Sequence, residues 1–242
     1  MTVDLSAVSA EFNLDMVVRA IMKAIEEDIP NQLREHPLET NNYIGLMRGD
    51  CINENLRNFA LVDGYELLRL QRYGWRGRLL VNREKRITLS IVTQANLYMI
   101  PRKRRTRPHY AMSILKVQNS DLQGQYEQQT FFSMDPFESE VLEEDYAAIM
   151  KGAIDLEEEF HHYFVAYRAE GNELVDVKLV LLDPKFNLVN ETSLNHLIVP
   201  DFARLTEEIT TDAPNEAEES HRKATRQLPK LKLGLRKMEE QA

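Results

Sequence analysis

Cysteine is nearly absent from this 242-residue chain, which contains only Cys51. A single cysteine excludes an internal disulfide and favours a reducing compartment, so we expect a cytoplasmic protein. A catalytic cysteine needs a neighbouring base, and no histidine lies near Cys51 in the sequence. We therefore interpret Cys51 as a buried or half-buried residue without a catalytic role.

Long apolar runs and signature motifs are also missing. The longest apolar runs, such as Leu179–Leu182, are too short to cross a bilayer, and the early Asp4 does not fit a secretory signal. The chain has no phosphate-binding loop, dinucleotide fingerprint or nucleophile elbow. We therefore expect no membrane partner and no cofactor, and a non-enzymatic protein is favoured over an enzyme.

A metal site is not indicated either. His161 and His162 stand beside the acidic run 157–159, but neighbouring residues of a strand point to opposite faces and cannot easily share one ion. The spacings HExxH and CxxC, which are typical of zinc sites, are lacking. The sequence therefore predicts no bound metal.

What the chain does contain is charge sorted into blocks. Residues 65–119 hold 13 Lys and Arg against two acids, a net charge of +11. Residues 120–220 hold five against 24, a net charge of −19, and residues 221–242 are basic again. Blocks of one sign either create a field that steers charged partners or neutralise one another inside the fold.

Helical and strand periods alternate along the chain. Apolar spacing predicts a helix over residues 14–29 that Pro30 stops, and no strong period follows up to residue 58. Residues 65–92 have the alternation of a three-stranded meander, and residues 160–189 have that of a second β-unit. An acidic helix is expected between the two units. These periods predict an α+β fold.

We expect one α+β domain over residues 1–205, with a helical N-terminus, a mostly antiparallel sheet from two β-units and helices packed on one side. The basic meander and its loop occupy residues 65–119, and residues 120–205 form the acidic second half. An acidic linker follows over 206–226, and a basic, leucine-rich tail covers 227–242. In this tail, Leu228–Lys237 alternates leucine with cations and is a candidate contact for a protein partner.

The strongest functional candidate is the basic run between Pro101 and Pro108, because a proline at each end favours a loop. Arginine binds phosphate oxygens bidentately, so this run predicts binding to DNA or RNA with little sequence preference. The nearby aromatic residues Tyr73, Trp75 and Tyr98 can stack on exposed bases. The predicted contacts are Arg76, Arg78, Arg102, Lys103, Arg104, Arg105, Arg107 and His109.

Two alternatives stay open. In the first, the cations pair with the acidic segments 138–145 and 157–159, and the charge blocks serve neutralisation or a protein partner. In the second, Asp176 and Lys178 form the end of the motif of PD-(D/E)xK nucleases, in which acids hold Mg²⁺ and the lysine helps to activate water. That family also needs an upstream acid, and Asp155 and Glu157–Glu159 lie in no convincing context. An ordinary amphipathic strand explains the pattern better.

Two further segments carry a family resemblance. They are Arg107-Pro-His-Tyr110, which opens a helix, and Val180-Leu-Leu-Asp-Pro-Lys-Phe-Asn-Leu-Val189, which is followed by Glu191 and Leu194. Together with the meander and the basic loop, they resemble an uncharacterised bacterial family of unknown function, found mainly in Gram-positive genomes and mobile elements. The resemblance covers about residues 60–198. It implies a bacterial or phage origin, fits a regulatory or antitoxin-like role, and assigns no catalytic residue.

Overall fold

A computed structural model of the chain describes residues 14–37, 39–40, 42–60, 65–72, 75–122 and 137–199. Residues 1–198 form one compact unit and residues 199–242 form a second. The expected acidic linker and the leucine-rich tail, Leu228–Lys237 included, lie outside the described residues. Within the described residues, no helix is long and apolar enough to cross a membrane.

The first helical segment continues past the residue that was expected to stop it. Helix α2 (Leu14–Met22) runs into a π-helix, η1 (Lys23–Asp28), and then into α3 (Ile29–Glu35). The prediction that Pro30 ends the helix was wrong. The π turns of η1 lie directly before Pro30, and their greater width leaves room for the proline ring inside the continuing helix.

A second long helix, α4 (Ile44–Ala60), packs against α2 and η1. No strong apolar period predicted it, because only Ile52, Asn55 and Leu56 are fully buried along its described side chains. One of these three is polar: Asn55 Nδ2 donates a hydrogen bond of 2.8 Å to the carboxylate of Asp28. A helix that docks partly through an amide escapes detection by apolar periodicity.

Six strands form one sheet in the order β1-β2-β3-β4-β5-β6. Neighbouring strands are antiparallel except β3 and β4, which are parallel, so the predicted mostly antiparallel sheet from two β-units is confirmed. The strands are β1 (Glu66–Arg72), β2 (Trp75–Asn82), β3 (Ile87–Thr93), β4 (His161–Glu170), β5 (Glu173–Leu182) and β6 (Leu188–Ser193). A short 3-10 helix, η3 (Asn195–Leu197), follows the last strand.

A parallel pair requires a long crossover connection, and here it contains helices. They are α5 (Gln94–Met99), α6 (Tyr110–Gln118), the 3-10 helix η2 (Ser120–Leu122) and α7 (Ser139–Met150). Lys151 and Gly152, both with positive φ, end α7.

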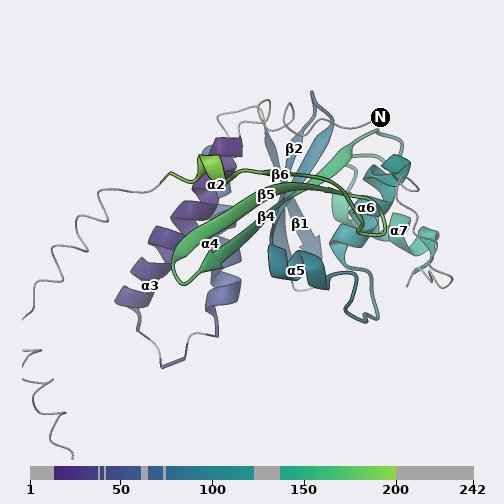
Figure 1. Cartoon of the computed structure of the whole chain (residues 1–242). Helices are drawn as coiled ribbons and strands as arrows, with labels where there is room; N and C mark the ends of the chain where they lie inside the picture. Colours follow the sequence, from purple (N-terminus) through teal and green to yellow (C-terminus); the bar gives the residue numbers. More distant parts are fainter. Residues whose placement is uncertain are drawn as a thin grey trace, which may run out of the picture. The chain divides into compact units, whose positions relative to one another are not determined.

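Helices cover both faces of the sheet, which corrects the expectation that they pack on one side (Figure 1). On one face, α2, η1 and α4 pack over a core that includes Leu89 and Val165. On the other face, α5, α6 and α7 pack over cores that include Val81 and Phe164. The crossover from β3 to β4 supplies this second helical layer, and both faces of the central strands are therefore buried.

The buried side chain of Asn119, at the end of α6, joins β4 and β5. Its Nδ2 donates to the backbone carbonyls of His162, at 3.0 Å, and Leu182, at 2.7 Å. Its Oδ1 accepts from the backbone N–H of His162 at 2.8 Å. Asn119 therefore satisfies three buried backbone groups at the start of β4 and the end of β5.

We predict that Asn119→Ala lowers the free energy of unfolding by about 3 kcal/mol or more, because it leaves buried backbone groups without partners. Urea denaturation measures the change. The control is Ser120→Ala, since among the described residues the exposed Ser120 hydroxyl bonds to the carbonyl of Val117 in its own turn. That change is expected to cost at most about 0.5 kcal/mol. Equal costs for the two substitutions would contradict the role given to Asn119.

Candidate nucleic-acid interface

The structure distributes the predicted contact residues over two faces of the sheet. In β2, Leu80 packs in the core under α2 and α4, and alternation places Arg76 and Arg78 on that same face. The loop of residues 101–109, here called the basic loop, follows α5 on the opposite face, where Leu97 packs with the core under α6. Arg76 and Arg78 therefore do not extend the surface of the basic loop.

Arg78 lies in a cluster of like charges at the edge of the sheet. It is half-buried and pairs across the strands with Arg69. Burial lowers its pKa, and the positive charges of Arg69 and Arg57 lower it further. Arg57 itself forms an ion pair of 2.5 Å with Glu54 on α4. This cluster is separate from the basic loop and contains an acid of its own.

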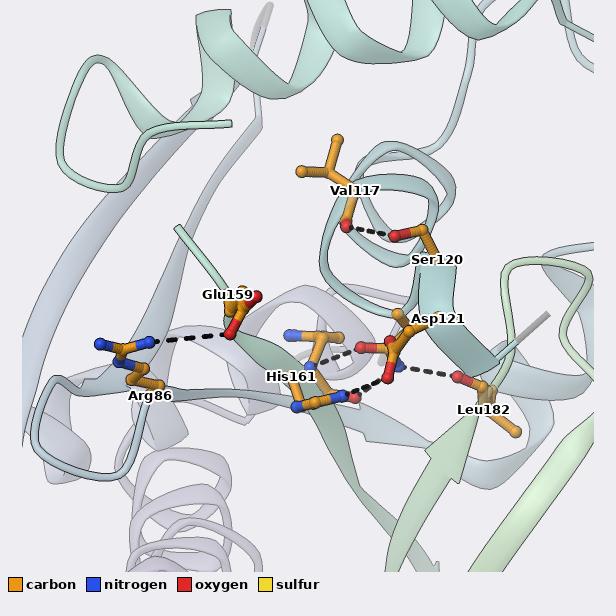
Figure 2. A network of polar contacts seen from close by, with 9 residues as sticks. Arg86, Val117, Ser120, Asp121, Glu159, His161 and Leu182 are labelled. Atoms are coloured by element: carbon orange, nitrogen blue, oxygen red, sulfur yellow. Dashed lines mark hydrogen bonds and ion pairs between the residues drawn. The ribbon is translucent and has the colours of Figure 1, made fainter. Parts of the chain in front are cut away.

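Three cations of the meander form ion pairs with acids. The ion pairs are Arg72–Asp145 at 2.7 Å, Arg83–Glu66 at 2.9 Å and Arg86–Glu159 at 3.8 Å. Figure 2 shows the last of these at the start of β4. Two of these pairs, Arg72–Asp145 and Arg86–Glu159, join the meander to the acidic segments 138–145 and 157–159.

The basic loop has a different environment. Arg102, Lys103 and Arg104 are exposed, and no ion pair seen among the described residues involves their side chains. Arg105 is half-buried, with its Nε covered, and Arg107 is exposed. The loop thus presents a row of cations to solvent, while Asp145 of α7 and Glu159 after it form ion pairs with arginines of the meander.

The basic loop is fastened at its C-terminal end by Arg72. Its Nη2 lies 2.7 Å from Asp145 of α7, and its Nη1 donates to the backbone carbonyl of Pro108. Asp145 also accepts a hydrogen bond from the Ser113 hydroxyl of α6. Each side chain of the ion pair is only 13% exposed. We call this set of contacts the Arg72–Asp145 latch, because it joins β1, α6, α7 and the end of the loop.

His109 acts as a helix cap at neutral pH. Its Nδ1 accepts a hydrogen bond of 3.2 Å from the N–H of Ala111 in the first turn of α6. Burial lowers the pKa of His109 to about 4, and the positive charges of Arg105 and Arg72 act in the same direction. A neutral imidazole adds no positive charge to the loop, and sequence reasoning, which counted it among the contacts, did not foresee this role.

A groove of about 330 Å³ adjoins the start of the basic loop, between α5 and the strands β4, β5 and β6. At its rim, the guanidinium of Arg102 lies 3.2 Å from the centre of the Tyr98 ring. The groove is lined by Gln94, Leu97, Tyr98, Pro101, Arg102, Ala166, Lys178, Val180, Leu182, Phe186 and Glu191. Sequence reasoning missed it, because strands and a helix far apart in the chain form its walls.

Asp176 and Lys178 project to the same side of β5, as their spacing predicted, but each has a partner. Gln94 Nε2 donates to Asp176 at 2.8 Å, and Lys178 Nζ lies 3.0 Å from Glu191. In the strand register, Asp176 lies opposite Arg168 of β4, which is seven residues, or about 23 Å, from the start of that strand. The acids of residues 155–159 come before the start of β4 and therefore lie far from Asp176. Among the described residues, no group of three or more His, Cys, Asp or Glu could hold a metal ion. The nuclease hypothesis gains no geometric support.

Cys51 lies on α4 and is half-buried, as expected. Burial raises the pKa of its thiol, and the negative charges of Asp28 and Asp50 raise it further. A thiol with a raised pKa is less often the reactive thiolate at neutral pH.

We predict a difference in acid sensitivity between the native protein and His109→Asn, which retains a capping side chain. Above pH about 6.5, neither the folded nor the unfolded chain protonates His109. Between pH about 6.5 and pH about 4, the unfolded chain binds a proton that the folded chain excludes. The free energy of unfolding therefore decreases as the pH decreases. The native protein should lose stability more steeply than the variant, by at most about 1.4 kcal/mol per pH unit. Parallel pH profiles in urea denaturation would refute this.

Comparison with known proteins places the chain in a family. A family model described as a family of unknown function (DUF5986) matches residues 6–242, which includes the segments Arg107–Tyr110 and Val180–Val189 that carried the resemblance. No curated protein and no solved structure matches the chain. The expected resemblance to an uncharacterised family is therefore confirmed, and its extent is greater than the predicted residues 60–198. The chain belongs to the family of unknown function DUF5986.

Proposed function

We propose that this protein is a non-enzymatic nucleic-acid-binding protein whose main contact surface is the basic loop. The observation that carries the proposal is the contrast within the basic segment. The meander cations Arg72, Arg83 and Arg86 have carboxylate partners, whereas Arg102, Lys103 and Arg104 are exposed without any among the described residues.

Adjacent cations without counter-charges suit a polyanion. Phosphate groups along a nucleic-acid backbone release condensed counterions when Lys and Arg neutralise them, and this release supplies much of the affinity. Arginine adds bidentate hydrogen bonds to phosphate oxygens. A row of this kind reads no base edges, so it supports binding that depends weakly on sequence and strongly on salt.

The Arg72–Asp145 latch and the His109 cap support the same proposal. They hold the C-terminal end of the loop against α6 and α7, while Lys103 N donates to the carbonyl of Met99 at the N-terminal end. A loop fixed at both ends loses less conformational freedom on binding than a free one. The sequence resemblance suggests a bacterial or phage-borne regulatory protein as the setting for this activity, and the single cysteine suggests the cytoplasm.

We predict that the double variant Lys103→Glu/Arg104→Glu binds nucleic acid at least about tenfold more weakly than the native protein. The slope of log affinity against log salt should become shallower by about 0.7 to 0.9 for each phosphate that the variant no longer neutralises. Both side chains are exposed, so the fold should be unaffected. Fluorescence anisotropy with a labelled oligonucleotide over a range of salt concentrations measures both quantities.

The matched control is Arg19→Glu/Arg34→Glu, which makes the same change in net charge at exposed positions on α2 and α3. Binding by this control should stay close to that of the native protein. If the two double variants weaken binding equally, only net charge matters and the loop is not the contact surface. If the native protein binds no nucleic acid, the proposal is wrong.

A further inference from the structure

We infer that the preferred ligand is single-stranded nucleic acid, with one base received by the groove beside the basic loop and stacked at Tyr98. This inference rests on the proposed function and specifies its ligand. The juxtaposition of the loop and the groove carries it: Pro101 and Arg102 belong to the loop and also line the groove. A nucleic-acid strand whose phosphates follow the basic loop therefore meets a base-sized recess at the first residues of the loop.

The groove has an apolar floor and a polar rim. Leu97, Ala166 and Val180 belong to the core cluster beneath it, and Phe186 packs against that cluster. Such a floor accepts the flat face of a base, and a recess of about 330 Å³ lies within the range of small-ligand sites. A phosphate group has no place on this floor, because an anion on an apolar surface loses its hydration without compensation.

The charges around the groove define the orientation of a bound strand. On the strand side, Lys178 and Glu191 lie 3.0 Å apart and neutralise each other. On the loop side, Arg102 has no carboxylate partner among the described residues and is continuous with Lys103 and Arg104. The net positive charge is therefore at the loop end, so phosphates lie there and the base points toward the strands.

Tyr98 is placed to stack on that base. Leu97 of α5 and Ile100, the residue that caps the helix, are buried in the core. Tyr98 between them is 61% exposed, so its ring is available to a ligand. The guanidinium of Arg102, 3.2 Å from the ring centre, extends the aromatic surface with a second planar group. Bases stack on aromatic rings and on guanidinium planes alike, and this stacking tolerates any base.

Single strands satisfy this geometry and duplexes do not. A base in a duplex is paired and stacked, so it reaches a recess in a protein only after it is extruded from the helix. The loop alone binds phosphates of either form, but the loop and the groove together discriminate in favour of unpaired bases.

The test compares three probes by fluorescence anisotropy: a labelled single strand of about twelve nucleotides, the same strand with abasic sites, and its duplex. The single strand and the abasic strand carry equal phosphate charge. The native protein is expected to bind the intact single strand about tenfold more tightly than the abasic strand. Tyr98→Ala should reduce this ratio to near one and leave the affinity for the abasic strand unchanged, while Tyr98→Phe should preserve it.

Met99→Ala is the matched control, because Met99 is also exposed on α5 but does not line the groove. It should leave the ratio intact. Equal native affinity for the intact and abasic strands, or a loss in Tyr98→Ala that is the same for both, overturns the inference and leaves the proposed function standing. Absence of binding to all three probes overturns the proposed function and the inference together. Thermal unfolding of each variant shows whether its fold is intact.

Discussion

The ion pair between Arg72 and Asp145 determines how the basic and acidic parts of this chain meet. Both side chains are largely buried, and each has one further partner, since Arg72 donates to the Pro108 carbonyl and Asp145 accepts from the Ser113 hydroxyl. A pair this far removed from water is tolerated only when such partners are present, and loss of one member costs about 3–5 kcal/mol. The latch therefore fixes α7 against β1 and fixes the end of the basic loop against both.

This arrangement explains why two groups of cations from one basic segment have different environments. The meander strands run beside α7 and the turn that follows it, so Arg72 and Arg86 meet the acids of that region. The first residues of the basic loop follow α5 and precede the end of the loop that the latch holds. There, Arg102, Lys103 and Arg104 meet no acid among the described residues. Solvated cations cost the fold little, and they remain available for phosphate.

Local patterns predicted much of the sheet but not its surroundings. Alternation identified the meander and the hairpin from β4 to β5, because each strand records its own burial pattern. Pro30 misled the assignment of the first helix, because the π turns of η1 accommodate its ring and no local pattern predicts them. Helix α4 escaped detection because Asn55 takes a core position. Helices on the second face followed from the parallel pairing of β3 with β4, which no local pattern reveals.

Part of the candidate site was also predictable from local sequence, and the rest depends on tertiary contacts. The basic loop was predictable, because Pro101 and Pro108 bracket a run of cations, but the exposure of its cations was not. Its separation from Arg76 and Arg78, the capping role of His109 and the groove beside Tyr98 depend on tertiary contacts. The pairing of Arg72 with Asp145 was foreseen only as a general alternative, because sequence shows the charge of a block and not which member faces which.

Amide hydrogen exchange in Asp145→Ala tests the latch most directly. The amides of Lys103, Met112 and Ser113 donate to carbonyls of Met99 and His109 and so report the two ends of the basic loop. We predict that Met112 and Ser113 exchange much faster in the variant than in the native protein, while the amides of β4 keep their protection. Unchanged exchange at Met112 and Ser113 would contradict the claim that this ion pair holds the loop in place.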